Sequence, residues 1–188
     1  MSTAANVETG KPQIGGAIYC APIGTTLPTS TKDTLDEAFI EVGYISEDGV
    51  TNDNAPENTK IKAWGGDTVL STQTNKDDTF KLTLLEALNV NVLKTTYGED
   101  NVSGDITSGI TIDATAEEIE SHAWVIDMAL GSVNKRIVIP NGVISSLDTI
   151  TYKDDTAVSY GLTIDAIATY IESIKKTVTH REFLLNAE

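Results

Sequence analysis

A change of hydrophobic period between residues 80 and 93 constrains the fold more than any other feature of the sequence. Three apolar residues first alternate with polar ones, which is the period of a strand with one buried face: Phe80, Leu82 and Leu84. Three more then recur at helical spacing: Leu85, Leu88 and Val92. The pattern predicts a strand followed by a short amphipathic helix over about residues 85–96. Gly98 suits the left-handed position just past the end of that helix.

The stretch before this strand predicts two further strands. Residues 60–64 and 68–73 both have strand composition, and Gly65-Gly66 separates them. A polar turn at residues 75–78 then leads into the next strand. Taken locally, Trp64 is expected in the core and the two glycines in a bulge, as in any β-rich domain.

The rest of the chain contains many short segments with strand patterns, separated by turn signals. They cover residues 15–21, 38–45, 105–112, 122–130, 135–140, 143–153 and 158–168. Asn141-Gly142 is typical of a tight turn, residues 169–176 fit either a helix or a strand, and residues 177–185 fit a terminal strand or arm. The sequence therefore predicts a mainly β fold, a β-sandwich or barrel of short antiparallel strands with one short α-helix packed at an edge.

The length of 188 residues suffices for one sizeable core and is short for two. We expect an N-terminal arm over residues 1–13, one β-sandwich domain over residues 14–176, and a C-terminal strand or arm over residues 177–188. Within the domain, residues 46–58 are expected to form a long polar loop. Such loops are typically mobile or become ordered on assembly.

The formal net charge is −15, from 28 acidic and 13 basic residues spread over both halves of the chain. Because no basic patch interrupts this balance, the sequence excludes nucleic-acid binding by phosphate neutralisation. Solubility alone accounts for such a charge. An acidic surface also suits a channel along which DNA slides without binding, since acidic walls repel phosphates.

The residues that carry most enzyme chemistry are scarce and poorly placed for it. The single cysteine, Cys20, excludes an intrachain disulfide and lies in an apolar segment, as a structural thiol does. Neither His122 nor His180 has a nucleophile motif nearby. Gly15-Gly16 and Gly65-Gly66 lack the following lysine or helix that phosphate binding requires, and the oxygen donors of residues 47–54 lack calcium-loop spacing. We therefore predict no enzyme, and no catalytic, metal-binding or cofactor-binding residues.

Three runs of the sequence together resemble a known family. They are residues 41–50 (EVGYISEDGV), residues 62–69 (KAWGGDTV) and the strand-plus-helix pattern of residues 80–93. In their order and spacing they resemble the major tail tube proteins of long-tailed, siphovirus-type bacteriophages. The resemblance covers residues 39–98 well and the rest of the chain in its general layout.

The resemblance implies a structural subunit of a bacteriophage tail. Six subunits of that family close into a ring, the rings stack helically into a hollow tube, and the tube conducts viral DNA into the host. The resemblance further implies two partners, a tape-measure protein and a tail terminator. It also implies a place in the virion after assembly in the host cytoplasm. The first six residues lack the features of a secretory signal, and no apolar run is long enough to span a membrane.

The alternative function is that of an immunoglobulin-like binding module, such as a phage adhesin or a capsid decoration protein. Such a module shares the many-stranded pattern. Self-assembly distinguishes the two, because a tube subunit forms rings or tubes and a binding module stays monomeric.

On the tail tube interpretation, three groups of residues receive roles. Acidic residues expected to face the lumen are Glu41, Asp67 and Asp127. Hairpin residues expected at the seam between subunits are Trp64, Gly65 and Gly66. Residues of the polar loop expected to contact the next ring are Asp48, Asn52 and Asp53.

Overall fold

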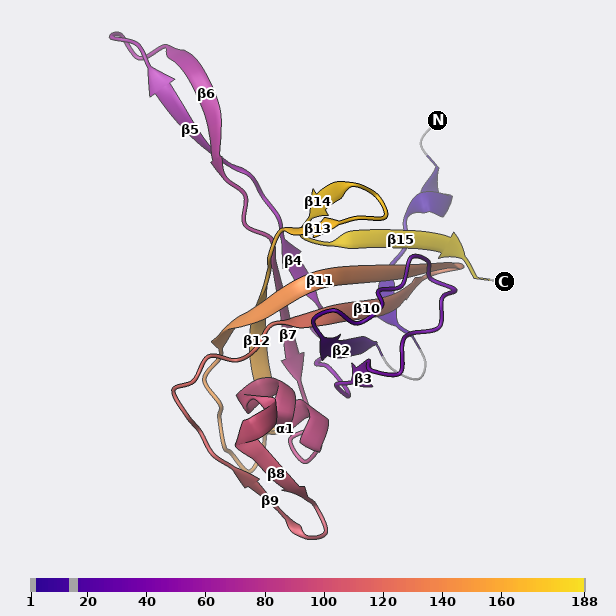
Figure 1. The fold of residues 1–188 in the computed structure, drawn as a ribbon. Helices are drawn as coiled ribbons and strands as arrows, with labels where there is room; N and C mark the ends of the chain where they lie inside the picture. The colour runs from indigo at the N-terminus through magenta and orange to yellow at the C-terminus, as the bar shows by residue number, and fades with distance from the viewer. Residues whose placement is uncertain (1–2, 14–16, 188) are drawn as a thin grey trace.

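Strand β11 (Val133–Leu147) organises the sheet, because its 15 residues pair with three other strands. Its first half lies between β10 (His122–Leu130) and β15 (Arg181–Asn186), and its second half pairs with β12 (Tyr160–Ala166). These strands are seen in a computed structural model that describes residues 3–13 and 17–187 (Figure 1). Six positions lie outside the described residues: 1, 2, 14–16 and 188. Residues 15 and 16 belong to the predicted strand 15–21, and the others belong to the predicted N-terminal arm, β-sandwich domain and C-terminal segment.

The sheet extends from this centre in both directions, and every pairing in it is antiparallel. Its other strands are β7 (Thr79–Leu84) and β4 (Thr51–Asp53) beyond β12, and β2 (Ile18–Pro22), β3 (Ile40–Glu41) and β1 (Gly10–Pro12) beyond β10. Among the described residues, three hairpins stand outside the sheet: β5 (Glu57–Lys62) with β6 (Thr68–Asn75), β8 (Val102–Asp105) with β9 (Gly109–Ile112), and β13 (Thr169–Ile171) with β14 (Lys176–Val178).

Helical structure is scarce in the described part of the chain. It consists of α1 (Val90–Tyr97) and two short 3-10 turns, Ala4–Asn6 and Glu99–Asn101. The mainly β, antiparallel fold with one short α-helix is confirmed. Across residues 3–13 and 17–187, no helix has the length and hydrophobicity that crossing a membrane requires.

Strand β10 is buried on both of its faces, which makes it the centre of the core. On one face Trp124 and Ile126 join the main apolar cluster, together with Phe80 and other residues of β7, β12 and α1. On the opposite face Ala123 and Val125 join a smaller cluster, covered by the segment of residues 23–39. Two layers of side chains therefore pack against one strand, and the long connection between β2 and β3 serves as a lid on the second layer.

The helix begins later than the hydrophobic pattern predicts. Asn89 is its N-cap, with its side-chain oxygen accepting from the backbone N–H of Asn91 at 3.0 Å. Leu88 precedes the cap and is exposed, so residues 85–89 form a connection rather than the first turn of a helix. The predicted start at about residue 85 is therefore wrong. Gly98 does end the helix with a φ of +100°, and its N–H donates to the carbonyl of Lys94 at 2.8 Å.

Asn141-Gly142 lies within β11 and is not the tight turn that the sequence predicts. Trp124 of β10 packs over Gly142 and donates from Nε1 to its carbonyl at 3.2 Å. A Cβ at residue 142 would lie 2.8 Å from Cδ1 of Trp124 and 2.8 Å from Cγ2 of Ile164. The glycine is thus needed for close packing of an indole ring against a strand, and not for a turn conformation.

Several loops and strands also differ from their predicted boundaries. The expected loop at residues 46–58 contains β4 and the start of β5, because β4 pairs with the edge of β7. Residues 105–112 form the end of β8, a turn and β9, since the side chain of Asp105 accepts from the backbone N–H groups of Thr107 and Ser108. The predicted strand at residues 38–45 shortens to β3 and an isolated bridge at Ile45.

Candidate assembly surface

The hairpin of β5 and β6 projects from the body of the subunit into solvent (Figure 1). All residues of both strands are exposed, and the two strands pair only with each other among the described strands. Ile61 and Leu70 face each other across the hairpin, yet both leave about half of their surface in water. An isolated two-stranded hairpin is marginally stable in water. A hairpin with exposed apolar residues therefore has the properties of a surface that packs against another molecule.

The tip of this hairpin carries Trp64, which is fully exposed. Two backbone hydrogen bonds close the tip: Ala63 N–H donates to the carbonyl of Asp67 at 2.8 Å, and Gly66 N–H donates to the carbonyl of Ala63 at 3.0 Å. Gly65 and Gly66 have φ values of +114° and +99°, which residues with a side chain rarely adopt. The local expectation of Trp64 in the core and a glycine bulge is therefore wrong. The turn presents the indole ring outward.

The base of the hairpin is held by the buried carboxylate of Asp78. Its Oδ1 accepts from Nδ2 of Asn52 at 2.8 Å, and its Oδ2 accepts from Thr179 Oγ1 and His180 Nδ1, both at 2.5 Å. These donors come from β4 and from the turn before β15, so one carboxylate joins three segments that are distant in sequence. Burial alone would raise the pKa of Asp78, but the hydrogen bonds from Thr179, Asn52 and His180 outweigh it and hold the pKa below its ordinary value.

The structure does not bring the three predicted lumen acids together within one subunit. Glu41 is exposed in β3, on the body, and Asp67 is exposed at the hairpin tip (Figure 1). Asp127 is buried in β10 and binds Arg136 through two hydrogen bonds, Nε to Oδ1 at 2.7 Å and Nη2 to Oδ2 at 2.8 Å. Contrary to the prediction from the sequence, Asp127 therefore does not present an acid to a channel, because its charge is paired inside the subunit.

Arg136 is the residue that sequence reasoning missed. Besides Asp127, it donates from Nη1 to the carbonyls of Ser30 and Asp33 at 3.0 and 2.7 Å. The guanidinium therefore fastens the covering segment of residues 23–39 to β11. Only the register of β10 against β11 places Asp127 opposite Arg136, so no local pattern reveals the pair.

The predicted inter-ring residues divide into two kinds. Asp48 and Asp53 are exposed and available to a partner. The side chain of Asn52 is engaged with Asp78 and with the carbonyl of Thr79, so its contribution within the subunit is structural.

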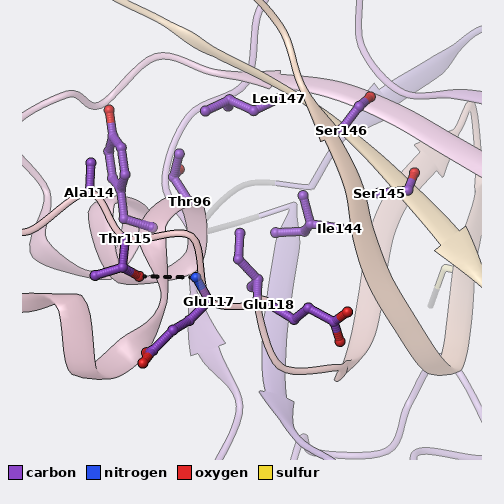
Figure 2. Close-up of a pocket in the computed structure, with 11 residues that line it drawn as sticks. Thr96, Ala114, Thr115, Glu117, Glu118, Ile144, Ser145, Ser146 and Leu147 are labelled. Atoms are coloured by element: carbon purple, nitrogen blue, oxygen red, sulfur yellow. Dashed lines mark hydrogen bonds between the residues drawn. The ribbon is translucent and has the colours of Figure 1, made fainter.

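A pocket of about 420 Å³ lies between the end of α1, residues 114–119 and the end of β11 (Figure 2). Its charged lining residues are Glu117 and Glu118, both exposed, and their side chains diverge instead of converging on one point. No histidine or cysteine is among the residues that line it. Within the described parts of the chain, no three His, Cys, Asp or Glu residues are grouped to hold a metal ion. Cys20 lies elsewhere in the core, where burial raises its pKa to about 11.

Replacing Asp127 by asparagine is expected to lower the free energy of unfolding by about 3–5 kcal/mol, because it leaves the Arg136 charge buried without its counterion. The covering segment of residues 23–39 should also become sensitive to limited proteolysis. Urea unfolding and a protease time course measure both effects. Lys135→Gln is the matched control, since its partially exposed pair with Glu182 should contribute less than about 1 kcal/mol. Equal losses in the two variants would contradict the prediction.

The lowered pKa of Asp78 has a consequence for stability at acid pH. The ionised carboxylate stabilises the folded state above its ordinary pKa of 3.8, and this contribution disappears as the pH falls through the lower folded value. We expect the stability difference between wild type and Asp78→Asn to be present at about pH 5 and to shrink progressively below about pH 4. Urea unfolding at several pH values measures it, with the exposed neighbour in Asp77→Asn as control. A difference that grows on acidification would refute this role.

Comparison with known proteins identifies the family. A family model described as "Phage tail tube protein" matches residues 11–179, and no curated protein matches the chain. Two solved structures are similar over the full length of both chains. They are the cap that terminates the tube of the anti-feeding prophage (10% identity, TM-score 0.44) and the sheath–tube complex of an extracellular contractile injection system in its extended state (9% identity, TM-score 0.41).

Both structural likenesses are distant and carry no further argument. The family match, by contrast, spans most of the 188 residues and includes the hairpin, the core strands and α1. The chain belongs to the phage tail tube protein family.

Proposed function

We propose that this structural tail tube subunit closes into rings of six, and that the rings stack helically into a hollow tube through which viral DNA enters the host. Family membership supports a tube subunit. The observation that carries the rest of the proposal is the exposed hairpin of β5 and β6, whose strands pair only with each other among the described strands.

Unpaired sheet edges give independent support for self-assembly. Among the described strands, β15 pairs only with β11 and β4 pairs only with β7, so each has one free edge. Leu184 and Leu185 of β15 are also largely exposed. A free edge with apolar side chains readily accepts a strand from another molecule. Joining such edges around a ring satisfies their backbone groups without leaving a new edge.

The net charge of the chain supports a tube lumen that repels DNA. A ring of six would carry a formal charge of −90, six times the −15 of one chain. Glu41 and Asp67 are exposed, so we propose them as lumen acids, while Asp127 is left out because Arg136 pairs with it. Acidic walls interact unfavourably with phosphates, so DNA slides along them without binding.

The purified protein is expected to form rings or hollow tubes in a concentration-dependent manner. Sedimentation velocity and negative-stain microscopy over a range of protein and salt concentrations measure this directly. Because the proposed contacts are apolar and involve backbone edges, assembly should persist at high salt, where like-charge repulsion is screened. A chain that stays monomeric under every condition would instead favour an immunoglobulin-like binding module.

The substitutions Glu41→Lys and Asp67→Lys are expected to slow DNA ejection without preventing tube formation. Each change places six lysines in every ring, and these attract phosphate where the native acid repels it. Ejection rates from phage particles that carry each variant provide the measurement. Glu41→Gln and Asp67→Asn are the controls, since they remove the acid without adding an attractive charge. Identical rates for the lysine variants and wild type would exclude these residues from a repulsive wall.

A further inference from the structure

A second apolar surface lies on the connection between β7 and α1. A pocket of about 630 Å³ opens there, and its apolar lining residues are Leu85, Ala87, Leu88, Ala157 and Val158. Leu88 leaves 72% and Leu85 leaves 37% of its surface in water. Exposed leucines around an open pocket are unfavourable in water, so this site also has the character of an unfilled contact.

Backbone and side-chain hydrogen bonds fix the shape of this pocket. Leu85 N–H donates to the carbonyl of Tyr44 at 2.9 Å. The carboxylate of Glu86 accepts from Tyr44 N–H at 2.9 Å and from Asn89 Nδ2 at 2.7 Å. Because Asn89 also caps α1, the connection is anchored to both the helix and the segment after β3. The pocket is therefore formed before any partner arrives, which reduces the entropic cost of binding.

The pocket and the hairpin tip lie at opposite ends of the subunit. In Figure 1 the hairpin of β5 and β6 projects from one end, whereas β7 runs toward α1 at the other end. A protruding group that fits a pocket on the far side of an identical molecule makes a heterologous contact. Such contacts repeat head to tail and extend an assembly along one direction.

Charge complements this geometry. Residues 57–75 contain two acidic residues and two lysines, so the hairpin is neutral on a chain whose net charge is −15. Lys62 lies two residues from Trp64. Residues 85–89, which line the pocket, contain one acidic residue. Residues 153–158, of which Ala157 and Val158 line the pocket, contain two more acidic residues and one lysine. The hairpin is thus the protruding element that can approach an acidic copy of the chain with little repulsion and with its lysines near opposite charges.

We propose that Trp64 of one subunit inserts into the pocket around Leu85 and Leu88 of a second copy of the chain, joining successive rings head to tail. This contact rests on the proposed function and assigns both partners of one link between rings. A large aromatic side chain entering a preformed apolar pocket is the usual form of an energetic anchor at a protein interface. The indole supplies the anchor, and the lysines near the tip orient it.

Chemical cross-linking tests the contact in assembled protein. Chains carrying Trp64→Cys and chains carrying Leu88→Cys are mixed, assembled and treated with a short bismaleimide. Dimers should form that neither chain yields alone. Cys20 does not interfere, because it is buried and its raised pKa keeps it in the unreactive thiol form. Trp64→Cys mixed with Tyr170→Cys is the control pair, since β13 lies at the hairpin end of the subunit (Figure 1).

Assembly measurements provide the second arm of the test. Trp64→Ala and Leu88→Asp should each raise the concentration needed for assembly by at least about tenfold, whereas Trp64→Phe should stay near wild type. Both residues are exposed in the subunit, so neither change removes a core contact. Near-ultraviolet circular dichroism, dominated by the buried Trp124, verifies folding.

The outcomes separate this contact from the proposed function. Cross-links between residues 64 and 88, together with weaker assembly of both variants, support the contact. If the wild-type chain forms tubes but Trp64→Cys cross-links only to Tyr170→Cys, or if Trp64→Ala assembles like wild type, the contact is overturned and the tube function stands. A wild-type chain that never assembles overturns the tube function and the contact with it.

Discussion

The pairing of β10 with β11 is the interaction on which the rest of the subunit depends. It places Trp124 against Gly142 on one face of the sheet and Asp127 against Arg136 on the other. The first contact closes the main core, because the missing Cβ lets an indole lie on the strand. The second fixes the segment that covers the opposite face. A shift of one residue in this register would exchange the two faces and lose both contacts.

This central pairing also explains how the body tolerates an exposed hairpin. The body encloses a continuous apolar cluster, and the Asp78 carboxylate joins β4, β7 and the approach to β15 where the hairpin leaves it. The hairpin therefore extends from a fixed base, although its own strands bury little surface. An element that contributes little to the stability of the subunit is free to be selected for contact with another molecule.

Those features of the fold that depend on local pattern could be predicted from the sequence. The alternation of Phe80, Leu82 and Leu84 correctly marks the buried face of β7, and Gly98 correctly marks the end of α1. The leucine spacing alone predicts a helix start that is too early, because the helix begins after Asn89, whose side chain is a good N-cap. An asparagine at this position is itself a sequence signal for the start of a helix.

Other features depend on partners that a sequence pattern does not identify. Trp64 has the hydrophobicity of a core residue. Hydrophobicity alone, however, does not distinguish the core of a subunit from the core of an interface. In the sequence, Asp127 looks like any acidic residue in a strand. Only the register of β10 against β11 places Arg136 opposite it. Asp78 and His180 are 102 positions apart and meet only in the folded chain. The sequence pattern thus predicts the hairpin as a local element, but its outward orientation required the structure.

The distribution of charge decides which surfaces of two copies can meet. A chain with a net charge of −15 repels its own copies over most of its surface. Apolar contact overcomes that repulsion only where the approaching element adds no further negative charge. In the proposed contact, the neutral hairpin of residues 57–75 meets this condition, and its exposed apolar residues would supply the attraction. In the proposed assembly, acidic charge on the rest of the surface would disfavour side-on association in wrong registers. The same charge would then favour both the solubility of free subunits and the order of the assembly.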